Sequence, residues 1–520
     1  MKDEFFFRDK LEDEWEANEV YAILSECDED FEPPLSERGS TVQKTWEKKS
    51  GDGVRNYFNE VAKQHILLLK REKKIIAFLS FRSMEECEAL KDYRDICYFT
   101  TLCIRKEYRG QGLALVLYQK AKEYVEESSR YTVMALRTWS TNKAQLHLME
   151  KMDFHCETRL KNDRGEGIDT LYFVKEITGK GIRAYGYTIG NGKCGIRNTI
   201  TDVPGVKVGH YTVRKGKNQT GVTVIIPCDG FVYERKPLAA VYALNGFGKT
   251  QGTVQIEELG VLETPIALTN TLNVGKAADG LVTFTEKECR KNGKELVSVN
   301  PVVGETNDSR INQITERVIE AEDVLFAIEH AEKNFKQGAV GAGRGTVCFG
   351  LKGGIGSASR ILTFGGKEYT IGVLVQSNFG KTQDLTVAGV PVGRQICTKM
   401  QNSAKEDKGS IMVIVGTDLP LGERQLKRVL KRAAVGLIRT GSFMGHGSGD
   451  VFIGFTNANG IPDTKEEQFH MMKYFPENQL DKVFRLVAEA VEESILNSLT
   501  CAKAMPGRDG EIYHSLSEFL

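Results

Sequence analysis

The apolar positions are arranged differently in the two parts of the chain. Residues 1–175 are charged, rich in helix-forming residues, and contain seven of the 52 glycines. The remainder consists of short apolar runs separated by Gly, Asn and Asp, as in GVTVIIP, AAVYALNG, YTIGVLVQSN and SIMVIVGTDLPL. Runs of this length with many Val and Ile are typical of buried strands. The change in pattern predicts two domains.

The boundary is expected where glycine is dense and periodicity is lost. The segment EITGKGIRAYGYTIGNGKCG carries six glycines, which predicts a linker within 176–195. We therefore expect domains at 1–176 and 181–520. Apolar spacing in the second domain predicts three helices, and strands with helices outside them predict a layered α/β fold. These helices are expected at 308–334, 425–440 and 481–499.

Composition excludes several classes of protein. The length of 520 residues exceeds one ordinary core, and Lys+Arg equals Asp+Glu at 70 each, so we expect neither a nucleic-acid nor a membrane partner. The 11 cysteines include no CxxC pair, which argues against a disulfide framework or a cysteine-rich zinc site. The eight histidines show no metal-binding spacing, so we predict no metal and interpret His210 and His446 as structural. The acidic N-terminal sequence and the lack of long apolar runs favour a reduced, cytoplasmic setting.

A glycine-rich loop marks the first domain. Residues 96–125 have the pattern of a strand, a loop and an amphipathic helix, and the loop is RGQGLA at 109–114. Small residues let backbone N–H groups approach a polyphosphate, and the N-terminus of the helix favours its negative charge. The alternative is a tight strand-to-helix turn that binds nothing.

The residues around this loop extend the pattern. Asn142 precedes the helical segment KAQLHLMEKMDF, and LYFVK at 171–175 follows as a late strand. With the R-x-x-G-x-G/A order of the loop, residues 5–175 resemble the GNAT family of acetyl-CoA-dependent N-acetyltransferases. The resemblance implies a mixed sheet with helices and acetyl-CoA as a substrate. It assigns the cofactor contacts to Leu102, Cys103, Ile104, Arg109, Gly110, Gln111, Gly112, Leu113, Ala114 and Asn142.

The sequence departs from this family at positions that matter for catalysis. Met149 stands where the family often has a Tyr general acid, and Asp153 replaces its usual Gly. Thr100 and Thr101 occupy the strand before the loop, which lacks the Glu often used as a general base. General acid–base catalysis contributes about 10²–10⁴-fold. The departures therefore weaken the case for acetyl transfer more than the case for acyl-CoA binding.

The second domain contains a candidate nucleophile. In KEDKGSIMVIVGTDLPL, 405–421, a charged loop gives way at Gly409-Ser410 to an apolar strand. Glycine permits the strained backbone that a serine hydroxyl needs to attack the preceding carbonyl. Cleavage would leave Ser410 with an α-amine of pKa ~8 as its own base, without a histidine. Because Gly-Ser before a strand is common, the alternative is an ordinary strand start.

Further motifs follow one another over most of this domain. They are NTITDVPGVKVGHYTV, LNGFGKTQG, LTNTLNVG, NPVVGET, KGGIGSASR, IGVLVQSNFG, GVPVG, GSIMVIVGTDLP and RTGSFMGHGSGD. In this order they resemble the DmpA/P1 (peptidase S58) family of self-processing aminopeptidases, which includes β-peptidyl aminopeptidases and D-aminopeptidase/esterase-amidases. The resemblance implies an αββα sandwich similar to that of the N-terminal-nucleophile hydrolases, no cofactor, and a homo-oligomer.

The same resemblance assigns roles to residues. Ser410 matches the nucleophile, and Gly409-Ser410 matches the processing bond. Asn378 matches an oxyanion-stabilising amide, and Ser448 with Asp450 matches a pair that hydrogen-bonds the nucleophile and its amine. Candidate contacts for the amine of the substrate are Glu305 and Asn270. One departure is Asn307, where the family often has an aromatic residue.

Three functional hypotheses remain open. In the first, a self-cleaving aminopeptidase acting on small peptides or aminoacyl amides is fused to an active N-acetyltransferase. In the second, the GNAT-like domain senses acyl-CoA without turnover. In the third, the chain is an unprocessed, non-catalytic scaffold.

Overall fold

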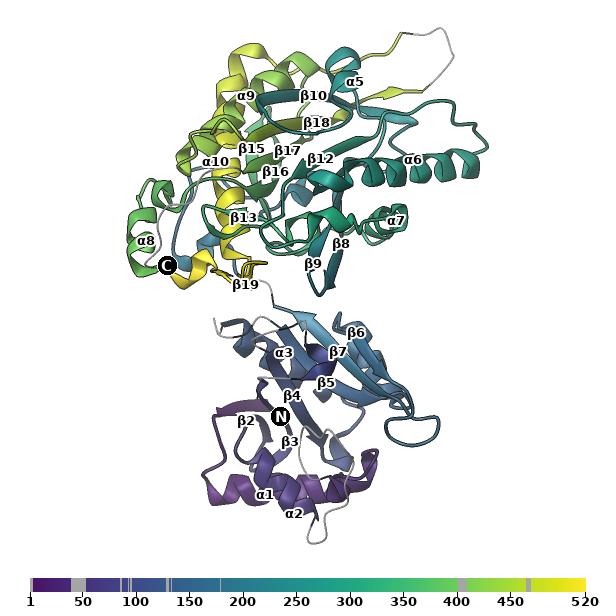
Figure 1. Cartoon of the computed structure of the whole chain (residues 1–520), viewed down its shortest axis with the longest axis vertical. Helices are drawn as coiled ribbons and strands as arrows, with labels where there is room; N and C mark the ends of the chain where they lie inside the picture. The colour runs from purple at the N-terminus through teal and green to yellow at the C-terminus, as the bar shows by residue number, and fades with distance from the viewer. Residues whose placement is uncertain are drawn as a thin grey trace. The chain divides into compact units, whose positions relative to one another are not determined.

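The computed structural model describes residues 3–38, 53–84, 87–91, 93, 96–127, 131, 133–177, 179–400, 409–463 and 469–520. The chain forms two compact units, Met1–Ile177 and Thr178–Leu520 (Figure 1). Each unit has its own sheets and its own hydrophobic core.

The first unit is built on a seven-stranded mixed sheet. Its strand order is β1-β2-β3-β4-β5-β7-β6, and the β4–β5 pair is parallel whereas the other neighbours are antiparallel. The strands are β1 (Asp3–Arg8), β2 (His65–Arg71), β3 (Lys74–Met84), β4 (Ile96–Ile104), β5 (Val133–Trp139), β6 (His155–Leu160) and β7 (Thr170–Glu176). The predicted strand at 171–175 is thus confirmed.

Helices cover both faces of this sheet. Apolar residues of α1 (Glu14–Glu26) and α2 (Gly53–Val61) form a core with one face. Those of α3 (Leu113–Glu127) and α4 (Lys143–Lys151) form a core with the other. The predicted strand, loop and helix at 96–125 are confirmed, because β4 leads through the RGQGLA loop into α3.

The second unit contains two larger sheets. One has the order β10-β18-β17-β16-β15 and the other β12-β11-β9-β8, with two short hairpins, β13–β14 and β19–β20, beside them. The five-stranded sheet comprises β10 (Arg235–Gly246), β15 (Ile355–Phe364), β16 (Lys367–Asn378), β17 (Ser410–Thr417) and β18 (Gly449–Pro462). The four-stranded sheet comprises β8 (Lys207–Lys215), β9 (Asn218–Ile226), β11 (Ile266–Asn270) and β12 (Val302–Thr306). The hairpin strands are β13 (Val347–Cys348), β14 (Leu351–Lys352), β19 (Met505–Pro506) and β20 (Ile512–Tyr513).

The two sheets pack face to face between layers of helices (Figure 1). Helices α9 (Glu423–Arg439) and α10 (Leu480–Thr500) cover the five-stranded sheet, and α6 (Val274–Lys291) and α7 (Ala321–Glu329) cover the four-stranded sheet. The shorter helices are α5 (Thr253–Leu259) and α8 (Gly393–Met400). The predicted αββα order is confirmed, as are the helices predicted at 425–440 and 481–499.

The central strand β17 explains the apolar runs of the sequence. Ile411, Val413 and Val415 face the core under α9 and α10, whereas Met412 and Ile414 face the core between the two sheets. A strand buried on both faces has no polar side to alternate with. The segment IMVIV is therefore apolar at every position, instead of alternating between apolar and polar residues.

The linker prediction is wrong over residues 179–195. The Gly179 N–H donates to the Cys501 carbonyl at 2.8 Å, and the Ile182 N–H donates to Asn497 Oδ1 at 2.8 Å. A Cβ on Gly179 would lie 2.1 Å from the Thr500 carbonyl oxygen. These glycines allow the segment to pack closely along α10, so their density reflects close approach of backbones rather than a flexible connection.

The helix predicted at 308–334 is also largely wrong, because α7 spans Ala321–Glu329 alone. Asp308 is fully buried, and its carboxylate accepts hydrogen bonds from Thr220 Oγ1 at 2.6 Å and Asn312 Nδ2 at 3.0 Å. Arg317 has a φ of 49°, which a right-handed helix cannot contain. The apolar residues Ile311 and Ile314 are buried from a turn and from a short 3-10 helix, Ile314–Glu316, rather than from an α-helix.

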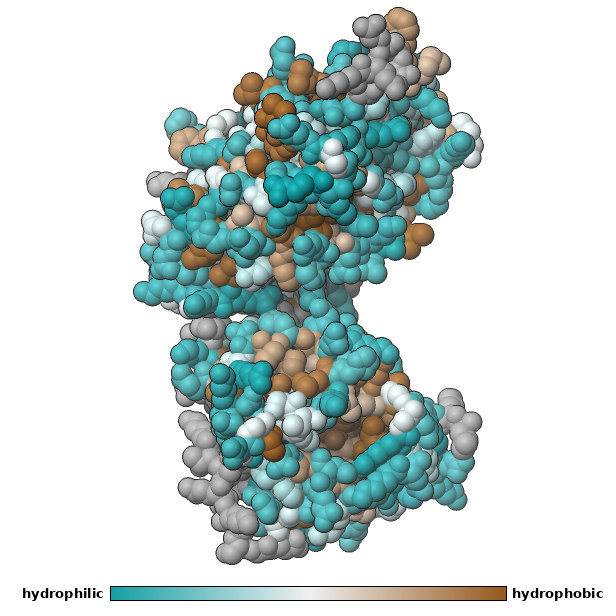
Figure 2. Space-filling view, turned by 90° about the vertical axis from the view of Figure 1, so that its right-hand side faces the viewer, coloured by the Kyte–Doolittle hydropathy of each residue, from teal (hydrophilic) through white to brown (hydrophobic). Residues whose placement is uncertain are grey.

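Figure 2 shows one face of the molecule. Polar residues cover most of the visible surface of both units, with smaller apolar groups between them (Figure 2). None of the helices in the described ranges is long and apolar enough to cross a bilayer.

Candidate functional site

Three strand ends bring together the residues that the sequence placed in the hydrolase site. Ser410 is the first residue of β17 and pairs with Asn378, the last residue of β16. On its other side, β17 runs parallel to β18, where Ile411 pairs with Asp450. The sheet register therefore places Ser410 between Asn378 and the start of β18.

Hydrogen bonds link Ser410 to the start of β18. The Gly449 N–H donates to Ser410 Oγ at 3.2 Å, and Ser448 Oγ donates to Asp450 Oδ1 at 2.7 Å. Ser410, Ser448 and Asp450 are all buried. A carboxylate and a hydroxyl held this way can orient a serine hydroxyl and favour a protonated amine beside it.

The Asn378 side chain is held from two directions. Its Oδ1 accepts the Val347 N–H at 2.9 Å, and its Nδ2 donates to the Asn307 carbonyl at 2.9 Å. These bonds fix which end of the amide is nitrogen, and Nδ2 carries a second N–H that can serve as a donor. Asn307, where the related family often has an aromatic residue, thus contributes through its backbone.

The bond before Ser410 lies against β16. A Cβ on Gly409 would be 1.8 Å from the Asn378 carbonyl oxygen and 2.4 Å from Phe379 Cα, so no other residue fits without displacing that strand. A cavity of about 220 Å³ opens beside Gly409. Its lining mixes polar and apolar residues and consists of Asn307, Ser309, Arg310, Val347, Asn378, Phe379, Gly380 and Gly409.

Glu305 lies close to the start of β18. Its Oε1 accepts the Lys249 N–H at 2.9 Å, and its Oε2 accepts the Thr271 hydroxyl. A Cβ on Gly248 would be 3.6 Å from Glu305 Oε1 and 3.9 Å from Gly449 Cα. Glu305 and Gly449 therefore both lie next to the loop that contains Gly248 and Lys249.

Asn270 belongs to a buried polar network. Its Nδ2 donates to Thr220 Oγ1 at 2.8 Å, and its Oδ1 accepts the Leu272 N–H at 3.2 Å. Thr220 in turn donates to Asp308, and burial raises the pKa of that carboxyl to about 6. Asp308 directly follows Asn307, so this network anchors the turn whose carbonyl orients Asn378.

Sequence reasoning missed the backbone groups of this site. The Gly449 N–H and the Asn307 carbonyl contribute through the main chain, so their residue types carry no signal of the contact. His210 fits its structural interpretation, because its ring nitrogens bond to Thr223 Oγ1 and the Lys336 carbonyl. Burial lowers the pKa of His210 to about 4.

A second site opens in the first unit where two parallel strands part. The β4–β5 pairing runs from Ile96 with Val133 to Phe99 with Leu136 and stops there. A cavity of about 280 Å³ lies between the strand ends beyond that point. Its lining includes five of the residues assigned to acetyl-CoA, namely Leu102, Cys103, Ile104, Arg109 and Asn142.

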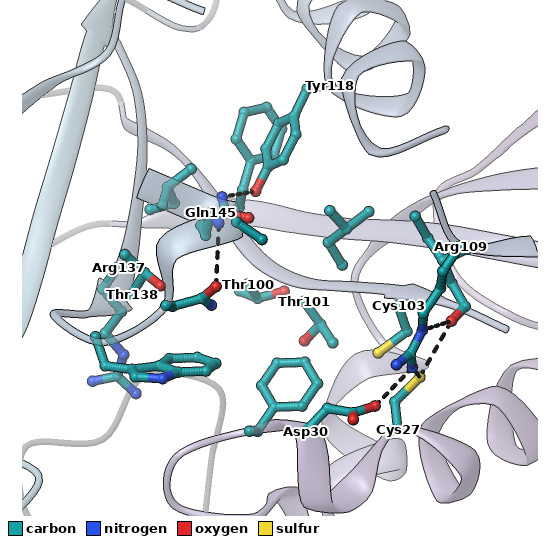
Figure 3. Close-up of a pocket in the computed structure, with 18 residues that line it drawn as sticks. Cys27, Asp30, Thr100, Thr101, Cys103, Arg109, Tyr118, Arg137, Thr138 and Gln145 are labelled. Atoms are coloured by element: carbon teal, nitrogen blue, oxygen red, sulfur yellow. Dashed lines mark hydrogen bonds and ion pairs between the residues drawn. The ribbon is translucent and has the colours of Figure 1, made fainter. Parts of the chain in front are cut away.

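An arginine lies at each end of this cleft (Figure 3). Arg109 and Arg137 lie at opposite ends, with Thr100 and Thr101 between them. Arg109 donates to the Ile104 carbonyl at 3.1 Å and forms an ion pair with Asp30 at 2.7 Å. It also contacts Cys27, whose pKa is lowered to about 7, mainly by a hydrogen bond with Cys103.

The loop after β4 presents backbone donors. Gly110 and Gly112 have φ values of 76° and 75°, a conformation that other residues rarely adopt. Among the described residues, the N–H groups of 110–114 have no hydrogen-bond acceptor. Successive free N–H groups at a helix N-terminus suit an anion such as pyrophosphate.

Comparison with known proteins identifies the larger unit. The model of peptidase family S58 matches residues 198–513, which is more than half of the chain. The chain belongs to peptidase family S58. Residues 18–154 match the model of the acetyltransferase (GNAT) family. The protein is thus an S58 hydrolase joined to a GNAT-like domain, and both family resemblances are confirmed.

Several similar proteins match 61% to 65% of this chain. The β-peptidyl aminopeptidase BapA of Sphingosinicella microcystinivorans is 37% identical over 343 residues, which are 61% of this chain and 85% of that protein. The PH0078 protein from Pyrococcus horikoshii is 46% identical and covers 65% of this chain and 96% of its own, with a TM-score of 0.61. The L-aminopeptidase D-Ala-esterase/amidase from Ochrobactrum anthropi is 33% identical, covers 65% of this chain and 95% of its own, and also has a TM-score of 0.61. That structure is described as a variant of the Ntn-hydrolase fold.

Proposed function

We propose that residues 181–520 are a self-processing serine aminopeptidase that cuts its own Gly409–Ser410 bond and then uses Ser410 as an N-terminal nucleophile. The observation that carries this proposal is the position of Ser410 Oγ. It lies at the start of a buried strand, 3.2 Å from the Gly449 N–H, beside Asn378 and the Ser448–Asp450 pair.

Processing needs the hydroxyl and the bond before it in one place. Ser410 Oγ attacks the Gly409 carbonyl carbon, the C–N bond breaks, and the acyl group moves from nitrogen to oxygen as an ester. Water then hydrolyses the ester, leaving the carboxylate of Gly409 and the free α-amine of Ser410. The reaction is intramolecular, so the fixed geometry supplies much of the rate.

Turnover repeats the same chemistry on an external carbonyl. The α-amine of Ser410 takes the proton from Oγ as Oγ attacks the scissile carbonyl, and the proton then passes to the leaving amine. The second N–H of Asn378 stabilises the oxyanion, a contribution of about 3 kcal/mol. Water completes the cycle by hydrolysing the acyl-enzyme.

The substrates follow from the site and from the relatives. Two relatives are named as a β-peptidyl aminopeptidase and as an L-aminopeptidase D-Ala-esterase/amidase, and these names favour peptides or aminoacyl amides with a free N-terminal amine as substrates. The cavity beside Gly409 takes the acyl group, because the acyl-enzyme has the same connectivity as the processing ester. Glu305, a buried carboxylate near Gly449, and Asn270 remain the candidate contacts for the substrate amine.

The Asp450→Asn variant separates processing from turnover. Autocleavage uses a carbonyl already in place, whereas turnover needs the α-amine in its correct protonation state beside a second amine. We expect this variant to mature and then to lose most hydrolysis of aminoacyl p-nitroanilides, with a displaced pH optimum. The measurement is the pH–rate profile of fully matured variant and parent. Equal rates at every pH would remove Asp450 from the site.

We also propose that residues 1–176 bind acetyl-CoA. The N–H groups of 110–114 hold the pyrophosphate, and the β4 end from Leu102 to Ile104, with Arg109 and Asn142, lines the path of the pantetheine arm. A second candidate, acyl-CoA sensing without transfer, is favoured by Met149, which is fully buried where the family often has a Tyr acid. The two candidates differ in whether the cleft also holds an acyl acceptor.

The Gly112→Asp variant tests the cofactor loop. It puts a carboxylate against the phosphate site and a side chain at a φ of 75°. We expect calorimetry to detect acetyl-CoA binding by the parent and at least about 100-fold weaker binding by the variant, a loss of about 3 kcal/mol. A parent that does not bind acetyl-CoA would reduce this loop to a turn.

A further inference from the structure

Three arginines converge on the face of the first unit's sheet at the Arg137 end of the cleft. Arg38 follows a short 3-10 turn at 35–37, Arg137 is on β5, and Arg164 is in the β6–β7 loop. Arg38 and Arg164 both donate to the carbonyl oxygen of Glu32, which brings their guanidinium groups together. Both are buried, with 7% and 9% of their surface exposed. Arg137 lines the cavity itself (Figure 3).

Aromatic rings connect the two buried arginines to the cavity. The Arg38 guanidinium lies 5.1 Å from the centre of the Phe31 ring, and that of Arg164 lies 5.3 Å from the Trp139 ring. The two rings are 6.0 Å apart and both line the cavity. The arginines therefore stand directly behind the aromatic wall of the cleft, in low-dielectric surroundings that strengthen their field.

The charges of the cluster repel one another. Burial, followed by the charges of Arg38 and Arg137, lowers the pKa of Arg164 to about 9, although the Asp163 carboxylate acts in the opposite direction. Burial is also the main reason that the pKa of Arg38 is lowered, and the charge of Arg137 adds to it. A bound anion would relieve this repulsion, and guanidinium groups suit a carboxylate because they can bind both of its oxygens.

We propose that this end of the cleft is the acyl-acceptor site of the GNAT-like domain and that the acceptor is a free amino acid, whose carboxylate is held by Arg137, the arginine of this cluster that lines the cavity, while Arg38 and Arg164 add positive charge from behind the aromatic wall. The inference rests on the proposed function, because it takes acetyl-CoA as the acyl donor. The proposed function assigns residues to acetyl-CoA but none to the acyl acceptor, and this inference names the class of that acceptor.

The position of Arg137 favours a small acceptor. The strands part after Phe99 and Leu136, and Arg137 is the next residue on β5. A carboxylate bound there has its amine one or two carbons away, near Thr100 and Thr101 at the centre of the cleft. The cavity of about 280 Å³ also has to admit the end of the acyl donor, so little volume remains for a longer acceptor. Phe31 and Trp139 offer apolar surface to a side chain.

With this acceptor, the product of the aminopeptidase would be a substrate of the GNAT-like domain. Hydrolysis by the aminopeptidase converts an N-terminal residue from an amide into a free amino acid, which creates the carboxylate that the cluster recognises. The neutral amine then attacks the acetyl carbonyl, the C–S bond breaks, and the thiolate of CoA leaves. The proton lost by the amine goes to the thiolate or to water, so the products are an N-acetyl amino acid and CoA.

The test compares amino acids with their amides, which keep the amine and lack the carboxylate. The protein is the full chain carrying Ser410→Ala, so that amides are not hydrolysed. β-Alanine, L-leucine and L-phenylalanine, each with its amide, are titrated by calorimetry, and N-acetylation is followed by mass spectrometry with acetyl-CoA. We expect binding and acetylation of at least one acid, with its amide weaker by about 10- to 100-fold.

Two variants locate the site. Adding Arg137→Gln should lower the affinity for the acid by about 10- to 100-fold while acetyl-CoA binding stays within about twofold, which also shows that the domain is folded. Arg8→Gln removes a charge from the same domain, where Arg8 pairs with Glu16, and should change neither affinity. Inorganic phosphate is titrated as a competing anion.

Each other outcome overturns the inference. Acetyl-CoA binding without binding of any acid, acids bound no better than amides, or acid binding that Arg137→Gln leaves unchanged would exclude this acceptor site. Binding of phosphate but of no amino acid would make the cluster a phosphate site. Acid binding without acetylation would contradict the acceptor role. Failure of the parent to bind acetyl-CoA would instead contradict the proposed function, and calorimetry detects it separately.

Discussion

Replacing Ser410 with alanine is expected to keep the chain at its full length and to abolish hydrolysis of aminoacyl p-nitroanilides. The same oxygen attacks in processing and in turnover, so its removal stops both reactions. Loss of a serine nucleophile typically lowers kcat by on the order of 10⁶-fold. The measurement is the intact mass of the purified variant, followed by its rate of hydrolysis.

A matched substitution controls for folding. Ser410→Cys keeps a nucleophile of similar shape, and a thiol can perform the corresponding N-to-S shift. We expect this variant to process and to become sensitive to iodoacetamide. A Ser410→Ala variant that is still cut between residues 409 and 410 would mean that another protease does the cutting.

Gly409→Ala is expected to slow maturation by at least about 100-fold, a typical cost of a misplacement of about 1 Å at a reacting centre. The added Cβ would lie 1.8 Å from the Asn378 carbonyl oxygen, so either the scissile bond or the end of β16 must move. Asn378 is the strand partner of Ser410, and displacing it disturbs the nucleophile and the oxyanion donor together. The measurement is a time course of intact mass after synthesis.

A glycine in open space provides the control for this substitution. Gly275 lies in the first turn of α6, and a Cβ there would meet no atom within 4 Å. Gly275→Ala should mature at the parental rate, since alanine is favoured over glycine in helices. A Gly409→Ala chain that matures as fast as the parent would show that the close approach to Asn378 is unimportant for cleavage.

The strands of the hydrolase could be predicted because their burial leaves a direct trace in the sequence. β17 faces apolar cores on both sides, so it is apolar at successive positions. Helices α9 and α10 have apolar faces that match their predicted ranges. The order of motifs also located the strand ends that carry Ser410, Asn378 and Asp450.

Two errors in the fold have physical causes that the sequence pattern hides. The glycine density at 179–195 is typical of a linker, yet Gly179 packs against the Thr500 carbonyl, where a Cβ would not fit. Residues 308–320 have helical spacing, yet the buried Asp308 and the positive φ of Arg317 impose turns. In both places tertiary contacts decide the local structure, and such contacts have no local signature.

Contacts between segments that are distant in the sequence could not be predicted either. Arg38, Arg137 and Arg164 come from three separate elements, and only the fold of the sheet brings them to one face. The Gly449 N–H and the Asn307 carbonyl act through the main chain, where side-chain identity carries no information. The sequence located the proposed nucleophile, whereas the main-chain groups beside it required the structure.

Intact-mass analysis of the freshly purified parent protein, combined with N-terminal sequencing, tests the central claim most directly. Self-processing predicts two polypeptides, residues 1–409 and 410–520, with Ser410 at the N-terminus of the second. A single chain of 520 residues that nevertheless hydrolyses aminoacyl p-nitroanilides would contradict the assignment of Ser410 as an N-terminal nucleophile.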